Sequence, residues 1–134
     1  MDTTIAANDR FTIRRRLRSF RYAGRGIVTM LASQHNAWIH AAATFTVFVV
    51  GAIVELSAIE WGLIILSVMA VWMAEALNTA FEFLAGVASP SFHPLVEKAK
   101  DVAAGAVLIS AFGALLIGLA VIGPHVWRSW AEML

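Results

Sequence analysis

Two carboxylates and one amide share a helical face inside an otherwise apolar stretch of this chain. Glu75, Asn78 and Glu82 stand at positions i, i+3 and i+7. At 100° per residue, this spacing places them within about 60° of one another on a helix. An ionisable group near the centre of a membrane helix costs roughly 2.5 kcal/mol or more. Chains that retain such groups usually use them for ions, protons or chemistry, so we expect the function to lie on this face.

The chemistry of this face depends on the depth of its two carboxylates and on the charged residues expected nearby. A carboxylate near the membrane surface can hold a hard cation, and a deeper one can accept a proton from a hydroxyl group. Across a predicted turn, Lys100 can contact phosphate oxygens, and Asp101 can bind metal or orient the lysine. Magnesium shares its oxygen ligands with nucleotide phosphates, and phosphoryl transfer depends on metal, cations and positioning of the nucleophile. The set favours transfer from a soluble nucleotide to an alcohol held in the membrane.

Three other interpretations remain open at this stage. Glu75 could pair with a lysine or an amide of a neighbouring helix as a purely structural contact. A small proton-coupled transporter would use Glu75 but would leave Lys100, Asp101 and His93 without a role. A membrane scaffold would tolerate Glu75→Gln. The sequence contains no phosphate-binding glycine loop of the Walker or protein-kinase type, and its four histidines lack metal-ligand spacing.

The composition is typical of one integral membrane domain. Of the 134 residues, 60% are hydrophobic and only 14% are charged, whereas soluble domains carry about 25% charged residues. The absence of cysteine excludes disulfides and thiolate chemistry. Residues 1–25 hold seven arginines against two aspartates. Such a basic end is typical of a cytoplasmic flank that meets anionic headgroups, so we expect no nucleic-acid partner.

The hydropathy pattern predicts an all-α integral membrane protein. We expect a disordered N-terminus over residues 1–10, an amphipathic surface helix over 11–33, a three-span membrane domain over 34–124 and a C-terminal tail over 125–134. The polar residues 33–36 should break the first helix. The spans are expected at 38–54, 61–84 and 102–122, separated by an acidic loop at 55–60 and a turn at 86–94. Gly123 and Pro124 should end the last helix.

Charge also predicts the orientation. The arginine-rich end and the loop with Lys98 and Lys100 belong on the cytoplasmic side, and three spans make these placements agree. Small residues crowd the third span and allow close helix contact. Three helices make a thin bundle, so we expect a homo-oligomer.

Two stretches carry a family resemblance. The run from Ala74 to Glu82, and the run from Phe92 to Val107 with its Ala-Lys-Asp motif, closely resemble the prokaryotic membrane-integral diacylglycerol kinase and undecaprenol kinase family. The resemblance covers roughly residues 15–120. It implies three spans and an N-terminal surface helix in a homotrimer with shared active sites. It also implies ATP as phosphate donor, Mg²⁺ as cofactor, and a bacterial inner membrane with the active site facing the cytoplasm.

The resemblance implies a role for each matching residue. Glu75 matches the catalytic base for the lipid hydroxyl, Asn78 an active-site amide, and Glu82 a metal-binding carboxylate on the nucleotide side. The other nucleotide-binding positions are Lys100, Asp101, His93, Arg15 and Tyr22. We expect Trp38, together with Glu75, to contact the lipid substrate.

Three positions depart from the family pattern. Gln34 stands where a second metal-binding glutamate is usual, and its amide oxygen can ligate metal only without charge. Gly86 and Ser91 replace acidic residues of the nucleotide loop. These departures bear on metal affinity and nucleotide choice, and they leave the main motif intact.

The choice of lipid depends on a short pattern. Asn36, Ile39 and His40 match the Asn-x-x-Ile-His pattern of the undecaprenol branch. This match favours undecaprenol as the phosphate acceptor, giving undecaprenyl phosphate. The alternative is diacylglycerol, giving phosphatidic acid. Taken alone, His40 is expected to be a neutral histidine satisfied at a helix interface.

Overall fold

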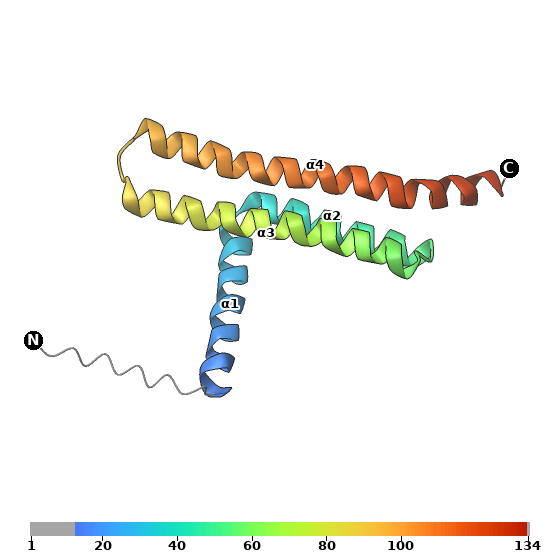
Figure 1. Ribbon diagram of the computed structural model, residues 1–134, viewed down its shortest axis with the longest axis horizontal. Coiled ribbons are helices and arrows are strands. Elements are labelled where there is room, and N and C mark those ends of the chain that lie inside the picture. The colour runs from blue at the N-terminus through green and yellow to red at the C-terminus, as the bar shows by residue number, and fades with distance from the viewer. Residues whose placement is uncertain (1–12, 134) are drawn as a thin grey trace, which may run out of the picture.

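The computed structural model describes residues 13–133, with side chains from residue 16 onward. Within that part, the chain forms four helices: α1 (Ile13–Ser33), α2 (His35–Ile53), α3 (Ala58–Ala88) and α4 (Pro94–Ala131). Figure 1 shows α3 and α4 side by side along most of their lengths, α2 against α3, and α1 directed away from this bundle. The predicted break at residues 33–36 is confirmed, since Gln34 separates α1 from α2.

Three of these helices can cross a membrane. Helices α2, α3 and α4 have 19, 31 and 38 residues and are apolar enough to span. At ~1.5 Å per residue, they measure about 28, 46 and 57 Å, against a hydrocarbon core of about 30 Å. The all-helical architecture with three spanning helices is therefore confirmed. Helices α3 and α4 extend well past the start of α2, at the end where they are joined (Figure 1).

The corner between α2 and α3 is tight. The backbone N–H of Leu56 donates to the carbonyl of Gly51 at 3.2 Å, and Glu55 takes a left-handed φ of 55°. A Cβ on Gly51 would lie 2.9 Å from Leu56 Cδ1 and 3.0 Å from the ring of Trp61. That ring stacks on Phe48 with centroids 5.4 Å apart. Glycine at position 51 is what allows the chain to turn this closely.

Helix α3 begins earlier than the sequence predicts. Ser57 caps its first turn, because its hydroxyl accepts from the Glu60 N–H at 3.4 Å while the Glu60 carboxylate accepts from the Ser57 N–H at 2.8 Å. This reciprocal capping box satisfies two amide donors that a helix start would otherwise leave unpaired. The prediction that Glu60 belongs to a loop is therefore wrong.

Two predicted helix ends are also wrong. Helix α3 continues past Leu84 to Ala88 and includes Gly86, and α4 continues through Pro124 to Ala131. A single glycine costs a helix only about 1 kcal/mol, and spanning helices tolerate proline when neighbouring groups satisfy the freed carbonyl. One breaker residue did not outweigh the apolar stretch around it.

The buried core is small. A cluster of Leu56, Ile64 and Val121 joins α3 and α4, and Trp61 packs against it. Most large apolar side chains lie on the outside of the described part of the chain. Such a surface suits contact with lipid or with other helices.

Candidate active site

One face of α3 changes from apolar to polar along its length. Its buried residues recur every three or four positions: Ile64, Ser67, Val71, Glu75, Asn78 and Thr79. This period keeps them on one side of the helix, toward its neighbours. The hydroxyls on this face donate to backbone carbonyls of α3 itself, Ser67 to Ile64 and Thr79 to Glu75, both at 2.8 Å. The carboxylate and the amide are thus left to interact with other side chains.

Glu75 is the most enclosed polar side chain in the site. It is 0% exposed, and within the described part of the chain neither carboxylate oxygen has a hydrogen-bond partner. The nearest charged or chargeable group is His40 on α2, whose Nε2 lies 3.7 Å from Glu75 Oε2. That nitrogen is also buried without a hydrogen bond to any described residue. The expectation of a satisfied His40 is therefore wrong.

A second polar group lies further along α3, around Glu82. Gln34 Nε2 donates to Glu82 Oε2 at 2.5 Å, and Asn78 Nδ2 donates to Glu82 Oε1 at 3.4 Å. Gln34 occupies the cap position of α2, but its side chain makes no capping bond there. It is thereby available to reach α3. The structure brings together three of the residues that the sequence singles out.

The oxygen donors here fit a hard cation. The described residues include no cluster of three or more His, Cys, Asp or Glu side chains that could hold a metal on their own. Magnesium, however, usually takes only one or two protein carboxylates and fills its shell with water and phosphate oxygens. Glu82 supplies one carboxylate, and Asn78 Oδ1 is buried without a described partner. The Gln34 amide, after a flip, would present a third oxygen.

A polar cavity of about 460 Å³ opens beside Glu82, where α3 meets α4. Its lining includes His93, Lys100 and Asp101, three of the predicted nucleotide residues, as well as Gly86 and Ser91, the two loop departures. Glu97 also lines it. The cavity therefore joins the predicted nucleotide residues of α4 to the metal-binding candidate of α3.

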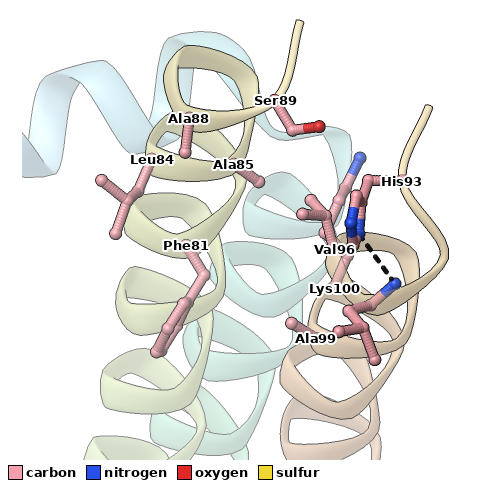
Figure 2. Close-up of a pocket in the computed structure, with 10 residues that line it drawn as sticks. Phe81, Leu84, Ala85, Ala88, Ser89, His93, Val96, Ala99 and Lys100 are labelled. Atoms are coloured by element: carbon pink, nitrogen blue, oxygen red, sulfur yellow. Dashed lines mark hydrogen bonds between the residues drawn. The ribbon is translucent and has the colours of Figure 1, made fainter. Parts of the chain in front are cut away.

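An adjoining apolar cavity of about 430 Å³ shares Lys100 and His93 with it. Figure 2 shows Lys100 on α4 and Phe81 and Leu84 on α3 around this second cavity. The His93 ring is fixed at the helix start, because its Nδ1 accepts from the Leu95 N–H at 3.2 Å. These two side chains stand between a polar and an apolar space.

Two predicted site residues, Tyr22 and Trp38, are not brought to these cavities. Tyr22 on α1 and Trp38 on α2 are 55% and 62% exposed and line none of the cavities described. The side chain of Arg15 lies outside the described residues. Their predicted roles therefore stay predictions.

The sequence did not predict the contact between His40 and Glu75. One signal was available, since a histidine within a spanning helix is costly and usually faces a partner. The partner itself depends on how α2 packs against α3, and spacing along the chain does not reveal that.

The comparisons with known proteins point to one family. The model of the prokaryotic diacylglycerol kinase family matches residues 21–122. The undecaprenol kinase of Bacillus subtilis is 41% identical over 84% of this chain and 91% of its own length. A diacylglycerol kinase of Synechocystis sp. is 37% identical over 79% of this chain and 61% of its own length. A diacylglycerol kinase of Helicobacter pylori is 41% identical over 38% of this chain and 40% of its own length.

The family match includes α2, α3 and nearly all of the apolar part of α4, together with every residue gathered around Glu75, Glu82 and Lys100. The chain belongs to the prokaryotic diacylglycerol kinase family and is a membrane lipid kinase of that family.

Proposed function

We propose that this protein transfers the γ-phosphate of ATP to undecaprenol, giving undecaprenyl phosphate. The observation that carries the proposal is the buried carboxylate of Glu75, which has no hydrogen-bond partner among the described residues. It lies 3.7 Å from His40, which lines an apolar space of the bundle, and one turn before Asn78, which contacts Glu82. A base in this place can meet a lipid hydroxyl on one side and a nucleotide phosphate on the other.

Glu75 is assigned as the general base, and Asn78 as the amide beside it. Reaction begins when the hydroxyl oxygen of the lipid attacks the γ-phosphorus while its proton passes to Glu75. A new O–P bond forms, the bond between the γ-phosphorus and the ADP oxygen breaks, and ADP leaves with the electron pair. Proton transfer to a positioned base typically contributes 10²–10⁴-fold in rate, as an order of magnitude.

Glu82 and Gln34 are assigned to hold Mg²⁺. When bound there, the ion supplies positive charge against the phosphate oxygens. The Lys100 ammonium adds a second positive charge at the polar cavity. Asp101 and His93, which line the same cavity, are assigned as further nucleotide contacts. Arg15 and Tyr22 of α1 are assigned to the nucleotide as well, and Trp38 to the lipid.

Undecaprenol is preferred for two reasons. The Asn-x-x-Ile-His pattern ending at His40 is the one that resembles the undecaprenol branch, and the undecaprenol kinase of Bacillus subtilis matches this chain over 91% of its own length. Diacylglycerol is the second candidate, because the relatives from Synechocystis sp. and Helicobacter pylori are diacylglycerol kinases.

The assembly and placement follow from the same proposal. Helix α1 is taken as an amphipathic surface helix and residues 34–124 as the membrane domain, whose last helix continues to Ala131. The predicted disordered N-terminus over residues 1–10 lies outside the described residues. Three copies form a homotrimer with shared sites. The protein resides in the bacterial inner membrane, with its N-terminus and active site on the cytoplasmic side, where ATP is available.

A parallel assay tests this function. Purified protein in detergent receives ATP labelled at the γ-phosphate, Mg²⁺, and either undecaprenol or diacylglycerol. We expect labelled undecaprenyl phosphate to form faster than labelled phosphatidic acid. The reverse order would select diacylglycerol, and the absence of label in both lipids would contradict kinase action on either one.

A further inference from the structure

A buried acid and a buried imidazole face each other in the bundle without completing their hydrogen bonds. The Glu75 side chain is 0% and the His40 side chain 15% exposed, with His40 Nε2 3.7 Å from Glu75 Oε2. Among the described residues, neither that nitrogen nor either carboxylate oxygen has a hydrogen-bond partner. A buried polar group left unpaired costs roughly 1–3 kcal/mol, and a charged one costs more. The fold therefore maintains this arrangement at a cost.

The spacing between the two side chains is set by the bundle. One turn from His40, the Thr44 hydroxyl accepts a hydrogen bond from Trp72 Nε1 at 3.1 Å. Trp72 lies one turn before Glu75 on α3, so this bond ties α2 to α3 beside the pair. On the other side, Thr79 donates to the Glu75 carbonyl at 2.8 Å. The Trp72–Thr44 bond thus helps to hold α2 in register against α3 beside the pair, while the Thr79 bond stays within α3.

The surroundings of His40 are those of a hydrocarbon site. His40 lines a partly open cavity of about 440 Å³ between α2, α3 and α4. Thr44 and Ser67 are the other polar residues in its lining, which is otherwise made of apolar residues such as Ile64 and Leu115. In such surroundings a charge pair interacts more strongly than in water. His40 therefore borders both the apolar cavity and the Glu75 carboxylate.

Resting on the proposed lipid kinase function, we propose that His40 is a positioning residue for Glu75. Its imidazole pairs with one carboxylate oxygen and leaves the other directed toward the lipid hydroxyl. Closing the gap to a charge-assisted hydrogen bond of about 2.8 Å needs only a small side-chain adjustment. During transfer, the hydroxyl proton passes to Glu75, and His40 exchanges no atom. Its contribution is to hold the base in one orientation.

Kinetics of five variants test this role. His40→Ala should lower kcat by roughly 10- to 100-fold, while the KM for ATP and the unfolding temperature stay close to wild type. His40→Gln, which retains an N–H donor, should recover most of the lost kcat. Glu75→Gln combined with His40→Ala should be no slower than Glu75→Gln alone, because residues that act as a unit are not additive. His125→Ala, a histidine at the far end of α4, should keep the wild-type kcat.

A second measurement is independent of turnover. In protein with ¹⁵N-labelled histidine in micelles, Glu75→Gln should shift the ring resonances of His40 and leave those of His125 in place. Unchanged His40 resonances would overturn the pairing, even in a preparation that phosphorylates neither lipid. Full kcat in His40→Ala would overturn the positioning role. So would a double variant whose loss equals the product of the two single losses, or equal kcat losses in His40→Ala and His40→Gln.

Discussion

Helix α3 contributes the acid to two acid–histidine pairs, Glu60 with His125 of α4 and Glu75 with His40 of α2. The two pairs differ in how completely their hydrogen bonds are formed. At the start of the helix, Glu60 Oε2 accepts from the Ser57 hydroxyl at 2.7 Å and its Oε1 lies 2.8 Å from His125 Nε2. Four turns further on, Glu75 and His40 remain 3.7 Å apart, and neither completes a hydrogen bond through its buried atoms to any described residue.

The difference in hydrogen bonding distinguishes a structural acid, Glu60, from a functional one, Glu75, on the same helix. Folding alone favours an arrangement in which polar atoms are paired, and even the partly exposed Glu60 is paired. An acid left unpaired in the bundle lowers stability, so its retention indicates a task that a paired acid could not perform. A carboxylate with both oxygens occupied by donors, as in Glu60, has little capacity to accept a substrate proton.

The largest expected effect comes from removing the unpaired acid. Glu75→Gln should lower turnover by roughly 10²–10⁴-fold, the range for loss of a general base. Because the neutral amide costs less to bury than a carboxylate, the unfolding temperature should stay level or rise. Lipid phosphorylation and thermal unfolding, measured on one preparation, check both parts. Retained turnover would contradict the functional role of Glu75, which would then be a structural acid like Glu60.

The next largest effect is expected at Gly51, which packs against Trp61 near the start of α3. Gly51→Val should lower the free energy of unfolding by about 1–3 kcal/mol, because its side chain would meet Leu56 and the stacked Trp61 ring. Turnover per folded molecule should remain near wild type. Unfolding in detergent measures the stability change, with Gly62→Ala as a control, because a Cβ at Gly62 would meet nothing within 4 Å. Equal stability of the Gly51 and Gly62 variants would contradict the tight corner.

A smaller effect is expected at Gln34. Gln34→Glu would set a carboxylate against Glu82, where an amide now donates at 2.5 Å. The two like charges should lower the unfolding temperature without Mg²⁺ and make Mg²⁺ stabilise the protein more. The half-activating Mg²⁺ concentration should fall roughly 10-fold, because ligand charge tunes cation affinity. Thermal unfolding against Mg²⁺ concentration measures this without turnover, and identical titrations for both proteins would remove Gln34 from the metal site.

The smallest expected effect is at the satisfied pair itself. Glu60→Gln and His125→Ala should each lower the unfolding temperature slightly, and the double variant should unfold close to the weaker single variant, since the two groups share one contact. Lipid phosphorylation should stay at the wild-type rate in all three proteins. A loss of turnover in these variants would show that complete hydrogen bonding does not distinguish a structural acid from a functional one.

The sequence predicted the part of the site that lies on one helix. The face with Glu75, Asn78 and Glu82 follows from helical spacing alone, and the structure places Asn78 and Glu82 in contact. The three apolar spans likewise follow from hydropathy, because burial of apolar residues dominates helix formation in membranes.

Features that depend on packing between helices could not be predicted in the same way. The contact of His40 with Glu75 depends on the register of α2 against α3, which the Trp72–Thr44 bond helps to fix. The continuation of α4 through Pro124 depends on neighbouring groups rather than on local propensity. Reading the chain as a series of local signals misses both.

The unequal helix lengths have a consequence for transport. Helices α3 and α4, with 31 and 38 residues, continue beyond the 19-residue α2, and the polar cavity lies on that extension. On the proposed function, the nucleotide stays in water and the lipid stays in the bilayer throughout a turnover. Only a phosphoryl group changes phase, so the enzyme needs no alternating-access cycle to bring together two substrates that dissolve in different solvents.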